Sequence, residues 1–211
     1  MGNRIFLVRH GMTDLNQRGC FCGVNEVLMN DEGVAQMRSV ARRLKDERFR
    51  RVYTSDLPRA VQSAGLAVPG HEIEPRAELR EMDFGLFEGL SPQECHNRYP
   101  HVYSEWIMDP VSAYIPDAEP VTSVAIRVRS FWKEALQRHT PGTDDLIVAH
   151  GGPIRIILGD IRRYPLPMVR NIECTCGSIT IVDIGNDKYQ MTRLLPNVVR
   201  EGGHAKFKLK L

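Results

Sequence analysis

Apolar residues follow two different spacings along the chain, one typical of buried strands and one typical of amphipathic helices. The unbroken apolar runs Ile5–Val8 and Leu146–Ala149 predict strands that are buried on both faces. Further runs predict strands at Val52–Thr54, Ile179–Ile184 and Tyr189–Leu195, with a hairpin turn at residues 185–187 between the last two.

Between these runs, apolar residues recur at steps of three and four, which predicts helices. In residues 31–48, Val34, Met37, Ala41 and Leu44 follow this spacing, with arginine and lysine between them. The segment SPQE at residues 91–94 is a capping box with proline at the first helical position, so a helix is expected to start there. The other predicted helices are Asp56–Ala67, Val121–Arg138 and Gly152–Ile161.

Strands that alternate with helices predict a three-layer α/β/α fold with a mostly parallel sheet, to which the final hairpin adds an antiparallel edge. The chain has 211 residues, of which 42% are apolar, and this suits a single domain over residues 1–211. Residues 90–118 are less periodic and rich in proline and tyrosine. We interpret them as an insertion that lies over the ligand-binding edge of the sheet.

Composition narrows the classes of partner. A formal net charge of +2 argues against nucleic-acid binding. No apolar stretch is long enough to span a membrane, and the N-terminus does not resemble a signal peptide, so a cytoplasmic location is expected. The five cysteines are expected to be free thiols, and the Cys-x-Cys spacing of two pairs is wrong for structural zinc. We therefore expect no metal and no cofactor.

Two predicted strands end in the same pair of residues. Arg9, His10 and Gly11 follow the first strand, and His150 and Gly151 follow the strand at Leu146–Ala149. Ligands of open α/β sheets bind at the carboxyl edge, so both imidazoles are expected to meet there. A neutral imidazole attacks phosphorus well, and the phosphohistidine that forms is labile to water.

Together with two further motifs, this pair resembles the histidine phosphatase superfamily, which includes cofactor-dependent phosphoglycerate mutases and many small phosphatases. The further motifs are TSDLPRAVQSA at residues 54–64 and LREMDFGLFEG at residues 79–89. The resemblance runs from Arg4 to about His204 and implies a phosphoglycerate mutase-like fold.

The resemblance implies a role for each matching residue. His10 is the implied nucleophile and Glu81 the general acid, with Asp83 as a competitor for that role and Glu88 as a structural residue. The other implied residues act on the phosphoryl group or at the substrate rim. His150 stabilises the transition state, Arg9, Asn16, Arg59 and Gly151 bind phosphate, and Thr13, Gly23, Tyr103 and Trp106 line the substrate rim.

Three functions are compatible with these motifs: a metal-independent phosphomonoesterase, a phosphoglycerate mutase and a binding protein that has lost catalysis. The inactive protein is disfavoured because every core position is present. Mutases of the family have a longer, basic insertion and a tail that covers the site. Here the insertion is short, with only His96, Arg98 and His101 as basic residues, and the tail, Phe207–Leu211, is short.

The preferred prediction is therefore a phosphatase of the short-chain branch, monomeric or homodimeric, acting on a small phosphorylated metabolite. Residues 79–85 and 117–121 also resemble α-ribazole phosphatases, except that Ala118, Glu119 and Pro120 replace the Gly-Glu-Ser of that group. Tyrosines and Trp106 in the insertion are expected to form a small satellite core, or alternatively a pocket wall for a ring on the substrate.

Overall fold

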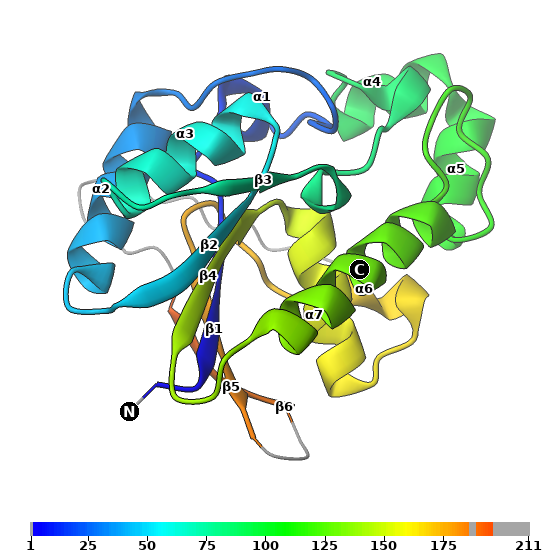
Figure 1. Ribbon diagram of the computed structural model, residues 1–211. Helices are drawn as coiled ribbons and strands as arrows, with labels where there is room; N and C mark the ends of the chain where they lie inside the picture. The colour runs from blue at the N-terminus through cyan, green and yellow to red at the C-terminus, as the bar shows by residue number, and fades with distance from the viewer. Residues whose placement is uncertain (1, 186–188, 196–211) are drawn as a thin grey trace.

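A mixed sheet with helices on both faces forms the centre of the molecule (Figure 1). The computed structural model describes residues 2–185 and 189–195. Within them, the sheet has the strand order β3-β2-β4-β1-β5-β6. The first four strands in this order are parallel, and β5 pairs antiparallel with both β1 and β6. The strands are β1 (Arg4–Arg9), β2 (Phe49–Ser55), β3 (Glu74–Arg76), β4 (Asp144–Ala149), β5 (Ile179–Ile184) and β6 (Tyr189–Leu195).

Alternate residues of the strands point to opposite faces and build two separate cores. Ile5 and Leu7 of β1 belong to the core under α6 and α7, whereas Phe6 and Val8 belong to the core under α2 and α3. Figure 1 shows α2 and α3 on one side of the sheet and α6 and α7 on the other. The helices are α1 (Asp14–Gln17), α2 (Asp31–Leu44), α3 (Pro58–Ala67), α4 (Pro92–Arg98), α5 (Pro100–Met108), α6 (Val121–Arg138) and α7 (Gly151–Arg162), with short 3₁₀ turns η1 (Ala77–Leu79), η2 (Gly85–Phe87) and η3 (Leu166–Asn171).

The predicted three-layer fold with a mostly parallel sheet and an antiparallel edge is confirmed. The helix Val121–Arg138, the last two strands and the capping box at Ser91 have the predicted bounds. The hairpin turn at residues 185–187 and the tail Phe207–Leu211 fall wholly or largely outside the described residues.

Three expectations differ from the structure. The helix expected from Asp56 begins only at Pro58, because a proline forces the residue before it, Leu57, into extended backbone. The helix expected to reach residue 48 ends at Leu44, and the chain turns there to enter β2. The insertion at residues 90–118 contains a second helix, α5, which apolar spacing did not predict.

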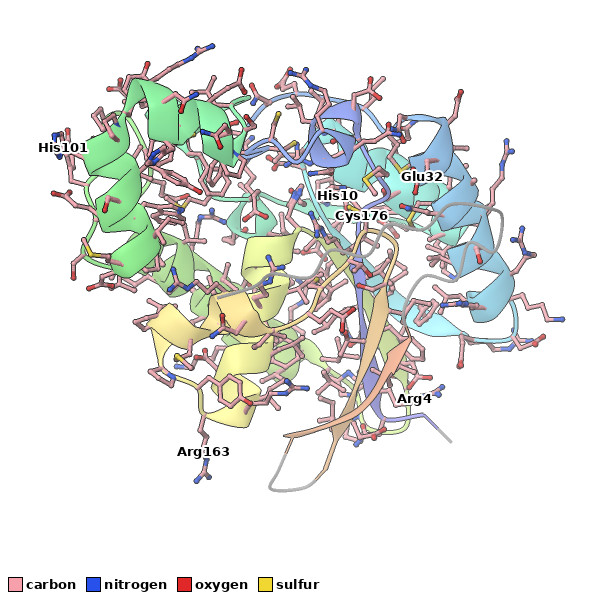
Figure 2. The ribbon with its side chains drawn as sticks, turned by 180° about the vertical axis from the view of Figure 1, so that it is seen from behind. Arg4, His10, Glu32, His101, Arg163 and Cys176 are labelled. Atoms are coloured by element: carbon pink, nitrogen blue, oxygen red, sulfur yellow. The ribbon has the colours of Figure 1, made fainter. Side chains whose placement is uncertain are left out.

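No helix of the described segments is both long and apolar enough to cross a membrane. The end of the sheet that carries the predicted site lies opposite the N-terminus. Figure 2 shows Arg4 at one end of the strands and His10 beside Cys176 at the other.

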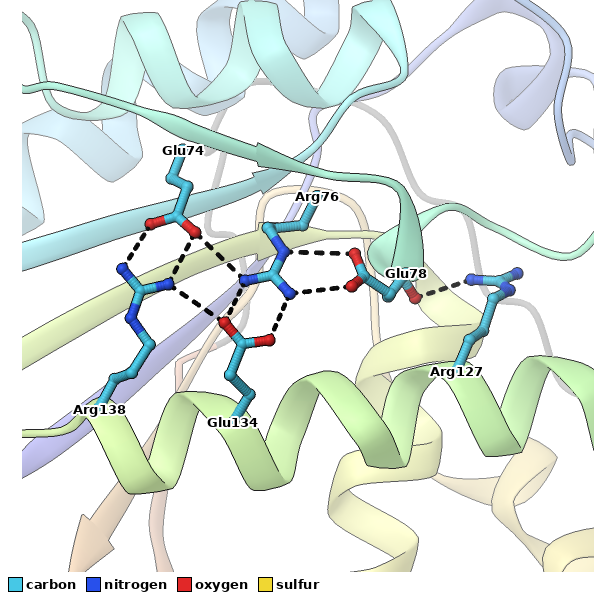
Figure 3. A network of polar contacts seen from close by, with 6 residues as sticks. All are labelled: Glu74, Arg76, Glu78, Arg127, Glu134 and Arg138. Carbon is cyan, nitrogen blue, oxygen red and sulfur yellow. Dashed lines mark hydrogen bonds and ion pairs between the residues drawn. The ribbon is translucent and has the colours of Figure 1, made fainter.

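An ion-pair network holds the edge of the sheet to α6 (Figure 3). The Arg76 guanidinium on β3 contacts the carboxylates of Glu74, Glu78 and Glu134, and Arg138 of α6 pairs with Glu74 and Glu134. The hydrogen bond from Arg76 lowers the pKa of Glu134 to about 2. Only 13% of the Arg76 side chain is exposed, against 38–42% of the carboxylates, so this arginine is the centre of the network.

Replacing Arg76 should therefore destabilise the fold more than replacing an arginine in an isolated pair. We expect Arg76→Met to lower the free energy of unfolding by about 2 kcal/mol, because three carboxylates lose their common partner. The matched control is Arg129→Met. Arg129 is an exposed residue of α6 that forms a single ion pair among the described residues, with Asp160. That change should cost less than about 1 kcal/mol. Urea denaturation measures both, and equal losses would contradict a central role for Arg76.

Candidate active site

His10 and His150 lie side by side at the carboxyl edge of the sheet. β1 and β4 pair in parallel with Arg9 opposite Ala149, so the residue after each strand reaches the same place. The backbone N–H of His10 donates to the carbonyl of Ala149, and the two ring centroids are 4.9 Å apart. Both side chains are buried. The sequence prediction that these two imidazoles meet is confirmed.

The His10 ring is held with one nitrogen available for chemistry. Its Nδ1 lies 2.7 Å from the carbonyl oxygen of Gly11. A carbonyl oxygen only accepts, so Nδ1 carries the proton and Nε2 keeps its lone pair. Gly11 is itself fixed, because its N–H donates to Ser63 Oγ at 3.1 Å.

Ser55 orients the second histidine. The Nε2 atom of His150 is 2.8 Å from Ser55 Oγ, which follows directly from the pairing of β2 with β4. Ser55 lies within the motif at residues 54–64, and no role was predicted for it from the sequence. The signal that would have found it is its place at the end of a strand next to β4.

Both imidazoles are neutral at ordinary pH. Burial lowers the pKa of His10 well below its usual value, and the charges of Arg9 and Arg59 lower it further. Burial likewise lowers the pKa of His150, with added effects from His10, Arg59 and Arg9. Neutral His10 therefore has the lone pair that a nucleophile needs.

Arg9 and Arg59 bring positive charge to the same place. Nη1 of Arg9 donates to the carbonyl of Cys174 at 2.6 Å, and Arg59 is fully buried. Five buried side-chain nitrogen or oxygen atoms in the described residues have no hydrogen-bond partner, and three of them are Arg9 Nε, Arg59 Nε and His150 Nδ1. Unpaired buried polar atoms are rare in proteins because they are costly, so three around one histidine pair mark a site suited to an anion.

Two charged residues fix the loop at residues 22–25, which follows α1. Arg59 donates to the carbonyls of Gly23 at 2.6 Å and Asn25 at 2.8 Å. From the other side, the Glu88 carboxylate accepts from the N–H groups of Gly23 and Val24, each at 3.1 Å. The structural role expected for Glu88 agrees with these contacts. Arg59 thus shapes the loop, and its charge also acts on both histidines.

Thr13 and Gly23 were expected on the substrate rim, and the structure buries both. Thr13 caps α1: its hydroxyl accepts from the N–H of Asn16 and donates to Asn16 Oδ1. Gly23 lies so close to Glu88 and to the Met82 carbonyl that a Cβ atom would lie 2.0 Å from the Glu88 carboxylate. These contacts support the loop and α1, and the place of Thr13 and Gly23 on the substrate rim stays a prediction.

Asn16 has an oriented side chain. Thr13 Oγ1 donates to Asn16 Oδ1 at 3.0 Å, and Cys176 Sγ lies 3.7 Å from the same oxygen. Because both contacts use the oxygen, the amide nitrogen points away from them and is the end of Asn16 available to a phosphoryl group.

The Glu81 carboxylate lies against the N-terminus of α7, close to His150. Its Oε2 accepts from the Gly152 N–H at 3.0 Å and its Oε1 from the Met82 N–H at 3.1 Å. A Cβ atom on residue 152 would lie 2.1 Å from Glu81 Oε1, so only glycine allows this approach. Gly151 precedes it, and a Cβ there would lie 3.6 Å from Arg9 Cζ. Asp83, the competitor, accepts from the Gly85 N–H at 2.8 Å within its own turn.

An arginine that the sequence analysis missed holds the segment before Glu81. Arg127 of α6 donates to the carbonyls of Glu78, Arg80 and Glu81 at 2.6–3.1 Å. The Glu119 carboxylate pairs with the same guanidinium through two hydrogen bonds of 2.8 Å. Figure 3 shows Arg127 at the end of the ion-pair network, next to Glu78. Nothing in the sequence pairs Arg127 with residues 78–81, because the contact depends on how α6 crosses the sheet.

The two aromatic residues expected on the rim have different surroundings. Tyr103 of α5 packs on Phe87 and His96, with ring centroids 5.9 and 6.3 Å apart, and is not among the described residues that line a cavity with Glu81. Trp106, three residues later, does line such a cavity. Tyr103 thus packs within the insertion, and its place on the substrate rim stays a prediction.

None of the five cysteines forms a disulfide, as expected from their number and spacing. Cys22, Cys174 and Cys176 lie near Thr13, Arg9 and Asn16 respectively. Across the described residues, no cluster of three or more histidine, cysteine, aspartate or glutamate side chains is arranged to hold a metal ion.

Comparison with known proteins places this geometry in a family. The profile described as "Histidine phosphatase superfamily (branch 1)" matches residues 5–195. Phosphoserine phosphatase 1 of Hydrogenobacter thermophilus is 25% identical over 181 residues, which cover 85% of each chain. The 2,3-bisphosphoglycerate-dependent phosphoglycerate mutase of Maricaulis maris is 23% identical and covers 87% of this chain and 89% of its own.

The crystal structure of the α-ribazole phosphatase from Shigella flexneri has the same fold. It superposes with a TM-score of 0.85 at 24% identity and covers 95% of this chain and all of its own. With a family profile that spans the sheet, both histidines and Glu81, the chain belongs to the histidine phosphatase superfamily, branch 1.

Proposed function

We propose that this protein hydrolyses small phosphomonoesters through a phosphohistidine formed on Nε2 of His10. The observation that carries the proposal is the neutral His10 ring beside His150, together with the unpaired buried nitrogen atoms of Arg9, Arg59 and His150. Phosphoryl transfer needs a positioned nucleophile and positive charge around the equatorial oxygens, and this site supplies both.

The reaction proceeds in two balanced steps. Nε2 of His10 attacks phosphorus while the bond to the leaving oxygen breaks, and protonated Glu81 gives its proton to that oxygen. Water then attacks the phosphohistidine, Glu81 takes a proton from the water, and the P–N bond breaks to return His10 and release phosphate. Arg9, Arg59 and His150 stabilise the charge on the phosphoryl oxygens in both steps, with Asn16 and the Gly151 N–H as further donors. This donor set supplies the charge that a metal ion supplies in other enzymes, so the proposal includes no metal.

Hydrolysis is favoured over mutase activity by the placement of the basic residues in the insertion. A mutase must bind two anionic groups and keep water from its phosphohistidine. His96, Arg98 and His101 are all exposed, and Figure 2 shows His101 on the outer side of α5, away from His10. The relatives named above include both activities. The proposal treats residues 1–211 as one domain with its insertion at 90–118, and the protein as a cytoplasmic monomer or homodimer.

Product analysis separates the two activities directly. One assay contains 3-phosphoglycerate and bisphosphoglycerate, and the other contains alkyl phosphates. We expect little 2-phosphoglycerate in the first assay and free phosphate in the second. An acid-labile phosphoenzyme should appear with wild type and disappear with His10→Ala, because attack and intermediate share one nitrogen atom. Rapid formation of 2-phosphoglycerate with little free phosphate would reassign the protein as a mutase, and labelling that persists in His10→Ala would refute the nucleophile.

Glu81 and Arg127 can be tested together through the leaving group. Glu81→Gln should slow hydrolysis of alkyl phosphates about 100-fold or more, and nitrophenyl phosphate much less, because nitrophenolate leaves without a proton. Arg127 acts as a positioning residue for the segment that ends in Glu81, so Arg127→Met should show the same selective loss, on the order of 10-fold.

Arg129→Met on the same helix is the matched control and should leave the ratio of the two rates unchanged. Equal losses for both substrates in Glu81→Gln would move the acid role to Asp83. An unchanged ratio in Arg127→Met would show that Arg127 supports the fold alone.

A further inference from the structure

A cavity of about 260 Å³ begins at the Glu81 carboxyl group and runs between the insertion and α7. We call it the Glu81 cavity. Gly152, whose N–H binds Glu81, lines the same end. Two arginines, Arg155 and Arg170, also line it. Most of the other lining side chains are apolar and come from α5, α6, α7 and η3: Trp106, Ile107, Val124, Ile156, Leu166 and Val169.

The walls of the Glu81 cavity are tied together without closing it. Arg170 of η3 donates to the carbonyl of Ile107 in α5 at 2.8 Å, and Arg155 of α7 donates to the carbonyl of Ile172 at 2.9 Å. Trp106 packs edge-on against Phe84, with ring centroids 6.2 Å apart. These contacts hold the walls in place without filling the space between them. A preformed apolar space binds an apolar group at low entropic cost.

Apolar side chains are also exposed beside the cavity. Ile107, which lines it, is 47% exposed, and Met168, between the lining residues Pro167 and Val169, is 49% exposed. Exposed apolar groups around an apolar hollow are typical of a ligand-binding site.

The place of the cavity follows from the role proposed for Glu81. A general acid must lie within hydrogen-bond reach of the leaving oxygen, at roughly 2.6–3.2 Å. The phosphoryl group faces His10, so the rest of the leaving alcohol occupies space next to Glu81. The Glu81 cavity lies next to this acid, because Glu81 and Gly152 line it.

We infer that the Glu81 cavity binds the leaving alcohol of the substrate, and that this alcohol carries an apolar body, preferably an aromatic ring. The inference rests on the proposed phosphomonoesterase activity. Arg155 and Arg170 also line the cavity, each with a hydrogen bond to a backbone carbonyl, but most of the lining is apolar. A ring therefore buries more apolar surface there than a small alcohol does.

A pair of alkyl phosphates with similar leaving groups tests the preference. Ethyl and 2-phenylethyl phosphate release alcohols of nearly equal basicity, so a difference in kcat/KM reports binding of the ring. We expect 2-phenylethyl phosphate to be the better substrate by about 10- to 100-fold.

Two variants and one control locate the effect. Trp106→Ala should remove most of the preference, measured as the ratio of kcat/KM for 2-phenylethyl phosphate to kcat/KM for ethyl phosphate. Leu166→Phe should reduce the same ratio by filling the cavity. Tyr103→Ala is the matched control: it changes another aromatic residue of α5 that packs on Phe87 instead, and it should keep the preference.

The outcomes separate this inference from the function on which it rests. Equal rates for the two alkyl phosphates, or a preference that survives both Trp106→Ala and Leu166→Phe, would overturn the cavity assignment and leave the phosphomonoesterase intact. No phosphate from any ester, and no phosphoenzyme at His10, would overturn the proposed function itself.

Discussion

The parallel pairing of β1 with β4 is the constraint on which the site depends. It places Arg9 opposite Ala149, so that His10 and His150 emerge from neighbouring strands at one edge of the sheet. β2 pairs with β4 on the other side and brings Ser55 to His150. Because each strand alternates between two packed cores, a slip of one residue in this register would move side chains to the wrong face and separate the two imidazoles.

Concentrating arginines beside two buried histidines is unfavourable for the folded chain, and the surrounding contacts offset that cost. The Nη atoms of Arg59 donate to carbonyls of the loop at residues 22–25, and Glu88 accepts from N–H groups of the same loop. Arg9 donates to the carbonyl of Cys174. Among the buried atoms left without a hydrogen-bond partner in the described residues are Arg9 Nε, Arg59 Nε and His150 Nδ1. The positive field is thereby held in place before an anion arrives, which is the preorganisation that electrostatic catalysis requires.

The sequence predicted what depends on local order along the chain. Arg9, His10 and His150 could be placed because each follows an apolar strand, and the ends of parallel strands share an edge. Contacts between distant segments were beyond it. Arg127 contacts residues 78–81 because of the way in which α6 crosses the sheet. The contacts of Thr13 were not predicted because α1, the short helix that it caps, was not predicted. Tyr103 and Trp106 could not be distinguished without α5, which sets the direction of each ring.

The central claim is that His10 is a neutral imidazole with its proton on Nδ1 and its lone pair on Nε2. ¹⁵N NMR of labelled protein measures this directly, with His10→Gln used to assign the signal among the seven histidines. Burial and the two arginines lower the pKa of His10. The account therefore predicts a neutral, Nδ1-protonated ring at neutral pH that stays neutral where an ordinary histidine, with a pKa of about 6.5, becomes charged. A ring that becomes charged near that ordinary pKa, or that carries its proton on Nε2, would contradict it.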